Sequence, residues 1–231
     1  MRQRHIKDVE AKIEAHGRLL LAYAEAPAEP SLRIAAEKAA GHPLRWYERA
    51  ARRMLLPDGY TRAYAEIGCG RGRFLNETAA ADPDGLYIGV EGQRSVVIKA
   101  IEKTEAAGLA NVRYAVTFVN DLTDLFGAAA LDGVYLHFPD PWPKDRHEKR
   151  RLTSAGHARG FLAALKTGGF LEFRTDNETF FEYSRAQIPS AGFRITAESR
   201  DLTAPRVQTE YERKFTSLGK PVYFLHAEKP V

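Results

Sequence analysis

Short runs of strand-forming residues recur along most of the chain, and helical stretches separate them. From Ala63 onward each run is bounded by glycine, proline or charged residues. Strands that alternate with helices indicate an α/β fold with a mainly parallel sheet. The predicted strands lie at residues 63–68, 85–91, 111–119, 131–138, 168–175, 192–201 and 221–228.

The two ends of the chain depart from this alternation. Residues 6–26 and 42–55 are rich in helix-forming residues on either side of a proline and glycine break, and they predict an N-terminal helical extension over residues 1–58. Residues 59–231 then form the α/β domain. The last two predicted strands have only the loop-like segment 202–220 between them, so we expect them to pair antiparallel at an edge of the sheet.

The composition is that of a globular protein with a sizeable core. The chain has 231 residues, 44% of them hydrophobic, and no apolar run is long enough to span a bilayer. The N-terminus is too charged for a signal peptide, so we expect a cytoplasmic location. The single cysteine, Cys69, excludes an internal disulfide and cannot by itself build a metal site, so no metal is expected. The net charge of +4 points only mildly to a polyanionic partner, and the sequence does not determine the oligomeric state.

The stretch AEIGCGRGRFL, residues 65–75, has the pattern of a strand, a glycine loop and the start of a helix. Gly68, Gly70 and Gly72 allow a tight turn whose backbone N–H groups face a ligand at the helix N-terminus. A GxGxG pattern alone is common. The dinucleotide fingerprint has GxGxxG spacing and a small residue where Arg73 stands, so NAD is disfavoured.

Acidic residues accompany this glycine loop. Glu66 precedes the first glycine and suits a ligand with an ammonium group, such as S-adenosylmethionine, better than a pyrophosphate. Glu91 ends the next predicted strand, where a carboxylate can accept hydrogen bonds from ribose hydroxyls. Asp121, with its neighbour Asn120, follows the third predicted strand and suits an adenine amino group. The alternatives are that Glu66 and Glu91 are exposed strand-end acids, and that Asp121 caps a short helix.

A proline-rich turn and a basic run follow the fourth predicted strand, in FPDPWPKDRHEKRR at residues 138–151. Pro139 and Pro141 fix φ on both sides of Asp140, which limits the movement of its carboxylate. Open α/β sheets hold their active sites at the carboxyl ends of such strands. The basic residues within 144–151 would be a solvated face in many proteins. Beside a cofactor crevice they indicate contact with a nucleic-acid backbone.

Four stretches resemble the bacterial-type tRNA (guanine-N7)-methyltransferases: EIGCGRGRFL, FPDPWPKDRHEKRR, TDN at 175–177 and TEYERKF at 209–215. The second and fourth are highly specific to that family, whereas most S-adenosylmethionine enzymes share the first. The resemblance implies a Rossmann-like S-adenosylmethionine-dependent methyltransferase fold, with a mainly parallel seven-stranded sheet and an antiparallel last strand. It also implies methyl transfer from S-adenosylmethionine to N7 of a guanosine in tRNA, which in this family is position 46 of the variable loop.

The resemblance implies roles for single residues, with Asp140 as the catalytic residue. His137 stands where the family more often has asparagine, and we expect it only to pack. Tyr211 would stack on the base, although an aromatic residue in such a segment is as often core. The expected cofactor-binding residues are Glu66, Gly68, Gly70, Gly72, Glu91, Asn120, Asp121 and Asp140; the substrate-binding residues are Lys144, Asp176, Thr209, Glu210, Tyr211 and Glu212; and the RNA contacts are Arg146, His147, Glu148, Lys149, Arg150 and Arg151.

Guanine N7 carries a free lone pair, so methyl transfer to it needs no general base. Positive charge moves from sulfur to the purine, and the protein's task is alignment plus negative potential near the base, which suits Asp140. A carboxylate of Asp176 or Glu212 would accept from guanine N1–H and the 2-amino group and so select guanine.

Three other classes of protein stay open. An enzyme that methylates an exocyclic amine typically has two adjacent prolines in this loop, which Asp140, Pro141 and Trp142 lack. A catalytically silent RNA-binding protein on the same fold would have no need of the acids at the crevice. An NAD oxidoreductase is disfavoured by the spacing of the glycine loop.

Overall fold

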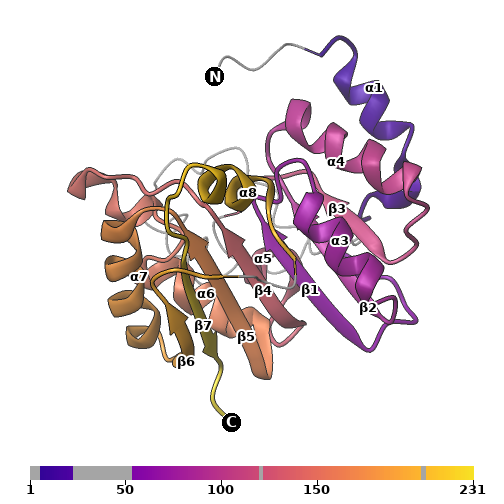
Figure 1. Cartoon of the computed structure of the whole chain (residues 1–231). Helices are drawn as coiled ribbons and strands as arrows, with labels where there is room; N and C mark the ends of the chain where they lie inside the picture. Colours follow the sequence, from indigo (N-terminus) through magenta and orange to yellow (C-terminus); the bar gives the residue numbers. More distant parts are fainter. Residues whose placement is uncertain (1–5, 23–53, 120–121, 204–206) are drawn as a thin grey trace.

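The computed structural model describes residues 6–22, 54–119, 122–203 and 207–231, and in these residues it contains one seven-stranded sheet with helices on both faces (Figure 1). The strands are β1 (Arg62–Ile67), β2 (Gly85–Val90), β3 (Val112–Ala115), β4 (Leu131–His137), β5 (Leu165–Thr175), β6 (Arg194–Ser199) and β7 (Tyr223–Glu228). The α-helices are α1 (Val9–Glu14), α3 (Arg73–Ala81), α4 (Arg94–Ala106), α5 (Leu122–Phe126), α6 (Ala155–Ala164), α7 (Glu178–Ser190) and α8 (Glu210–Ser217), with 3-10 helices η1 (Gly17–Leu19) and η2 (Asp145–Arg150).

The strand order is β3-β2-β1-β4-β5-β7-β6, with β4 at the centre. Strands β1 to β5 run parallel, whereas β7 pairs antiparallel with both β5 and β6. The predicted fold class and the antiparallel last strand are therefore confirmed. The chain runs outward from β1 to β3 and then returns to the other side of β1 as β4. This reversal creates the switch point at which open α/β sheets bind their ligands.

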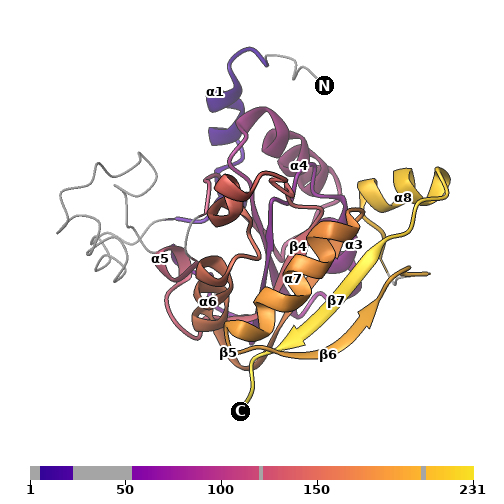
Figure 2. The same ribbon diagram turned by 90° about the vertical axis from the view of Figure 1, so that its left-hand side faces the viewer.

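Alternation along the strands divides the core into two layers (Figure 2). On β1, Ala63, Ala65 and Ile67 belong to the cluster that also contains the buried residues of α5, α6 and α7. Tyr64 faces the opposite layer, with buried residues of α1, α3 and α4. Because side chains on a strand alternate between faces, Glu66 lies on the same face as Tyr64. The side chain of Glu66 therefore lies in the layer between the sheet and α3.

The segment 202–220 was predicted as a loop, and this prediction was wrong because the segment contains α8. The helix begins with a reciprocal cap: the hydroxyl of Thr209 accepts from the backbone N–H of Glu212 at 3.0 Å, and the Glu212 carboxylate accepts from the N–H of Thr209 at 2.6 Å. Such a capping box satisfies two backbone donors that a helix start leaves without partners. It stabilises a short helix in an otherwise polar segment.

The predicted helix over residues 6–26 is also wrong for residues 15–22, while residues 23–26 lie outside the described part of the chain. The α-helix ends at Glu14, and a 3-10 helix follows at Gly17–Leu19. Leu20 then forms a parallel bridge to Tyr114 of β3, and the N–H of Leu21 donates to the Tyr114 carbonyl at 3.0 Å. Pairing with an open sheet edge replaces the helix that local propensity favours. The second predicted helical segment, 42–55, lies mostly outside the described residues.

The described part of the N-terminal extension packs on the α/β domain. Ile13 and Leu19 are buried in the α3 and α4 layer, and Glu10 of α1 forms an ion pair with Arg94 of α4. The boundary near residue 58 stays a prediction.

Candidate active site

A pocket of about 480 Å³ opens where the carboxyl ends of β1 and β4 meet. It lies at the switch point of the sheet, as expected for a ligand site of this fold class. Its walls come from the glycine loop 68–72, from residues 90–93 after β2, from 117–119 after β3, from the loop 138–142 after β4, and from 209–211 at the start of α8.

The glycine loop forms one wall of this pocket. Gly68, Gly70 and Gly72 have φ of 74°, 57° and 72°, a region that glycine enters at little cost. A Cβ at Gly72 would lie 2.7 Å from the Cβ of Ala100 in α4, so only glycine fits there. The helix α3 starts at the next residue, which confirms the predicted order of strand, loop and helix. The backbone thus turns around the pocket and directs a helix N-terminus at it.

Glu91 fixes the glycine loop to the end of β2. Its carboxylate accepts from the N–H of Gly70 at 3.2 Å and from the N–H of Gln93 at 2.8 Å. Burial raises the pKa of Glu91 above its ordinary value, the backbone donors oppose this, and the charge of Asp140 adds to the rise. The Glu91 carboxylate therefore lines the pocket in an orientation set by two backbone N–H groups. It interacts electrostatically with Asp140.

The loop after β4 holds Asp140 between two strained residues. Phe138 and Trp142 have φ of 49° and 41°, a left-handed conformation that bulky residues rarely adopt. Arg151 holds the second of them, because its Nε and Nη2 atoms both donate to the carbonyl of Trp142 at 3.2 Å. Backbone strain of this kind persists only where surrounding contacts enforce it, and it gathers at functional sites. Asp140 itself is exposed and lines the pocket.

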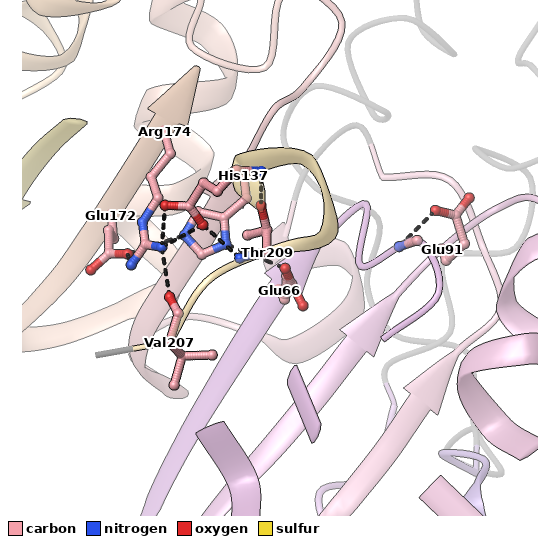
Figure 3. Close-up of polar contacts among 9 residues, drawn as sticks. Glu66, Glu91, His137, Glu172, Arg174, Val207 and Thr209 are labelled. Atoms are coloured by element: carbon pink, nitrogen blue, oxygen red, sulfur yellow. Dashed lines mark hydrogen bonds and ion pairs between the residues drawn. The ribbon is translucent and has the colours of Figure 1, made fainter. Parts of the chain in front are cut away.

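A row of charged side chains, mostly buried, begins at Glu66 and His137 in the pocket wall and continues behind it through β5 to α8 (Figure 3). His137 lies between two carboxylates: Nδ1 is 3.3 Å from Glu66 Oε1, and Nε2 is 3.1 Å from Glu172 Oε1. Arg174 continues the row, with Nη2 2.7 Å from Glu172 Oε1 and Nη1 2.9 Å from Glu212 Oε2. Along the row the groups are Glu66, His137, Glu172, Arg174 and Glu212. Acidic and basic side chains therefore alternate when His137 is protonated.

The titration of this row follows from its pairing. Burial opposes charge on His137, but the hydrogen bonds to Glu172 and Glu66 outweigh it and raise the pKa of His137 above its ordinary value. Burial likewise opposes charge on Glu172, yet His137 and Arg174 lower its pKa to about 2. The pKa of Glu66 is raised by burial in spite of His137. His137 and Arg174 therefore favour the charged form of Glu172, whereas burial of Glu66 outweighs its contact with His137.

The first turn of α8 closes the side of the pocket that faces the loop after β4. Tyr211 is 57% exposed, so it is not a core residue, and its ring stacks on Phe138 with centroids 5.7 Å apart. Glu210 accepts from Lys103 of α4 at 2.9 Å, and the same ammonium group donates to the carbonyl of Arg71 in the glycine loop at 3.1 Å. The start of α8 is thus joined to both the glycine loop and the strained loop.

Most of the predicted cofactor-binding residues line the pocket, whereas the predicted substrate-binding residues Glu212 and Asp176 do not. Glu212 is only 2% exposed and its carboxylate is bound to Arg174 and Thr209, so its position gives no support to a contact with guanine. Asp176 is half-buried at the end of β5 and does not line the pocket. Asn120 and Asp121 lie outside the described residues. The predicted residues that line the pocket are Glu66, Gly68, Gly70, Gly72, Glu91, Asp140, Arg150, Thr209, Glu210 and Tyr211.

The basic run forms η2 beside the pocket, and its members have different roles. None of the residues of η2 is buried. Arg150 lies over the ring of Trp142 at 4.9 Å and reaches the pocket wall. Arg151 is half-buried, and besides its bonds to Trp142 it lies over the ring of Tyr183 at 4.3 Å. The exposed members of the run are Lys144, Asp145, Arg146, Glu148, Lys149 and Arg150, and His147 is half-buried.

Sequence reasoning missed three members of the buried row: His137, Glu172 and Arg174. The expectation that His137 only packs was wrong, because both of its ring nitrogens meet carboxylates. A signal was present, since the charged residues at 172 and 174 alternate with apolar ones along the predicted strand 168–175. The capping box of α8 was also visible as the pattern T-x-x-E at 209–212.

Within the described ranges, no helix is long and apolar enough to cross a membrane. Nor do those residues contain a group of three or more histidine, cysteine or acidic side chains that could hold a metal ion.

Comparison with known proteins now connects this site to a family. A family described as "Putative methyltransferase" matches residues 61–225. The chain is 40% identical over 169 residues to the tRNA (guanine-N(7)-)-methyltransferase of Bacillus licheniformis, which covers 71% of this chain and 79% of that protein. It is 38% identical to the enzyme of that name from Bacillus subtilis, with the same coverage. The solved structure of 16S rRNA methyltransferase KamB has the same fold, with a TM-score of 0.60 at 15% identity over 78% of this chain and 97% of that chain.

The sheet order, the glycine loop and the pocket at the switch point are those of an S-adenosylmethionine-dependent methyltransferase. The chain belongs to the tRNA (guanine-N(7)-)-methyltransferase family.

Proposed function

We propose that this protein transfers the methyl group of S-adenosylmethionine to N7 of a guanosine in tRNA. The similarity to relatives of that name over 71% of the chain carries the proposal. A pocket that joins a glycine loop, Asp140 and an exposed aromatic residue beside a basic turn supports it. We further propose that the guanosine is position 46 of the variable loop, as the resemblance implies, and that the enzyme works in the cytoplasm with its tRNA.

The residues of the pocket fit S-adenosylmethionine. Glu66 lines the pocket, and its Oε2 atom is buried with no hydrogen-bond partner among the described residues, so it offers an acceptor to a cationic group such as the ammonium of the cofactor. Glu91 offers a second carboxylate for ribose hydroxyls. The glycine loop shapes the wall between these two carboxylates, and its glycine N–H groups already have acceptors: Gly68 donates to the carbonyl of Val90, Gly70 to Glu91 and Gly72 to the carbonyl of Cys69. When bound, the cofactor supplies an electrophilic methyl group on a sulfonium.

The protein's part in catalysis is to orient the base and to place negative charge near it. Guanine N7 has a lone pair at neutral pH, so no residue needs to remove a proton before transfer. Asp140, fixed between Phe138 and Trp142, holds its negative charge at the pocket wall, where it stabilises the charge that develops on the purine. Tyr211 offers an exposed ring on which a base can stack.

Glu91→Ala should weaken S-adenosylmethionine binding by about 1.5 to 3 kcal/mol, because a hydrogen bond to a charged group is removed. The anchor of the Gly70 N–H is removed as well. Isothermal titration calorimetry measures this change directly. Glu102→Ala is the matched control, since Glu102 lies on α4 and pairs with Lys99 away from the pocket. Equal affinity of Glu91→Ala and the parent protein would remove Glu91 from the cofactor site.

The exposed lysines of the basic run should contact tRNA phosphates. Replacing Lys144 and Lys149 together by alanine is expected to flatten the slope of log affinity against log salt by about 0.9 for each phosphate that is no longer neutralised. The arginines at 150 and 151 are less suitable for this test, because both also support Trp142. Cofactor affinity should not change.

The control for this experiment removes the same charge elsewhere. Arg185 and Arg194 form ion pairs with Glu198 and Glu228 at the β6 side of the sheet, and neither lines the pocket. The double variant Arg185→Ala, Arg194→Ala should keep the parental salt slope. If both double variants change the slope equally, the basic run is ordinary surface and does not bind phosphates.

The choice of N7 as acceptor is tested with a modified substrate. A tRNA transcript that carries 7-deazaguanosine in place of guanosine lacks the N7 lone pair but keeps both exocyclic and ring N–H groups. The proposed function predicts methyl transfer to the ordinary transcript and none to the 7-deaza transcript. Equal transfer to both transcripts would instead identify an enzyme that methylates another atom of the base or another nucleotide.

A further inference from the structure

We propose that His137 is a positioning residue for the cofactor: as an imidazolium, it holds the Glu66 carboxylate charged and fixed in the pocket wall so that Glu66 binds the ammonium group of S-adenosylmethionine. This rests on the proposed function and adds a residue for which we expected no role. Figure 3 shows the arrangement, with His137 between Glu66 and the pair Glu172 and Arg174.

Two ionised carboxylates at hydrogen-bond distance require both ring nitrogens of His137 to donate. Nδ1 lies 3.3 Å from a Glu66 oxygen and Nε2 lies 3.1 Å from a Glu172 oxygen. A neutral imidazole has one N–H, so it can donate to one of these carboxylates and must turn a lone pair to the other. When both acids are ionised, only the imidazolium donates to both. The side chain of His137 is 3% exposed, so water cannot readily take the place of either partner.

Glu66 depends on this partner because it is buried. Its side chain is 5% exposed, and Oε2 has no hydrogen-bond partner in the described part of the chain. A buried carboxylate without a nearby positive charge tends to take up a proton. A protonated Glu66 would offer the cofactor's ammonium a neutral group in place of an anion. The positive charge of His137 opposes that change and leaves the second oxygen, Oε2, for the ligand.

The charged and titratable groups that face His137 come from three elements besides its own. They are Glu66 on β1, Glu172 and Arg174 on β5, and beyond Arg174 the buried Glu212 of α8. On the helix side Phe74 of α3 places its ring edge-on at 4.3 Å, and it has no titratable group. On its own strand, the ring of Tyr135 lies 5.7 Å away, and burial raises the pKa of its hydroxyl, so it stays neutral.

The balance of these groups favours the protonated ring. The carboxylates raise the pKa of His137 above the ordinary value of 6.5 despite burial. Because the pKa is raised in the folded state, the stabilisation from the imidazolium is complete below the ordinary pKa and is lost as the pH rises through the raised one. Cofactor affinity should follow the same course, since the ordering of Glu66 depends on the same proton.

His137→Gln provides the test, because glutamine keeps a polar side chain that cannot become charged. S-adenosylmethionine affinity, measured by calorimetry at mildly acidic pH, should be roughly tenfold lower in this variant, the loss typical of a hydrogen bond to a charged group. The ratio of the two affinities should shrink as the pH rises through the pKa of His137. Titration of the cofactor's own amino group affects both proteins alike and cancels in the ratio.

The control is His226→Gln, since His226 is on β7, stacks on Phe170 and does not line the pocket. This variant should follow the parent at every pH. A ratio for His137→Gln that is tenfold at every pH, or no difference at any pH, would overturn the proposal, because either result shows that the charge of His137 has no role in binding. A parent that binds no S-adenosylmethionine would contradict the proposed function itself, and with it the role of His137.

A measurement on the parent protein covers the case in which the variant does not fold. Nitrogen-15 spectra of the histidine rings distinguish an imidazolium from a neutral imidazole. Near neutral pH, His137 should give the signature of a ring with both nitrogens protonated. A neutral ring under those conditions would contradict the proposal without any substitution.

Discussion

Asp140→Asn should lower turnover by about two to three powers of ten, the usual loss when one preorganised electrostatic group is removed from an active site. Asparagine keeps the size and part of the hydrogen bonding of aspartate and removes the charge. The backbone on both sides of Asp140 is held in the left-handed region at Phe138 and Trp142, so a substitution at 140 should not release the loop. The change therefore isolates the effect of charge.

The appropriate measurement is a single-turnover rate with cofactor and tRNA both saturating, so that binding does not enter the result. Affinity for tRNA should change little, because the proposed phosphate contacts lie in the basic run. Because N7 needs no deprotonation, the rate of the parent should also show no dependence on a base that titrates near neutrality. Near-parental turnover in Asp140→Asn would show that the carboxylate has only a structural role.

Arg174→Met is expected to destabilise the protein by about 3 to 5 kcal/mol, because removal of one partner leaves a buried charge uncompensated. Arg174 is 5% exposed and contacts Glu172, Glu212 and the carbonyl of Val207. Methionine fills a similar volume but can pair with neither carboxylate. Arg174→Lys should recover only part of the stability, since an ammonium cannot reproduce the forked geometry of a guanidinium.

Urea denaturation measures this change in stability. Arg185→Met serves as the control, because Arg185 forms an exposed ion pair with Glu198 and its removal should hardly move the midpoint. Acid should weaken the same row in the parent: the pKa of Glu172 is lowered to about 2, so its stabilising effect is complete above the ordinary value of 4.5 and is lost as the pH falls towards 2. A midpoint for Arg174→Met equal to that of the control would show that the buried row adds little to stability.

The strands and the glycine loop could be predicted because their signals are local. Apolar runs of strand length, a GxGxG turn and an acid at the next strand end are all read from neighbouring residues. The position of β7 between β5 and β6 was not predicted, since two strands close in sequence indicate a pair but not where the pair joins the sheet.

The buried charge row could not be predicted as a unit, because its members come from different elements. Glu66, His137 and Glu172 meet only when β1, β4 and β5 are adjacent and in a register that pairs Glu66 with Tyr135 and Tyr135 with Glu172. From sequence, His137 was only a departure from a family pattern. The helix wrongly predicted at residues 15–22 has the same cause, since the bridge of Leu20 to Tyr114 depends on a sheet edge far along the chain.

The identity of the methylated nucleoside tests the central claim most directly. Bulk tRNA that lacks the modification is incubated with the protein and S-adenosylmethionine labelled in the methyl group, and the digested RNA is separated by liquid chromatography and mass spectrometry. The account predicts label in 7-methylguanosine and in no other nucleoside. Label in N2-methylguanosine or in a methyladenosine, or no transfer although the cofactor binds, would contradict it.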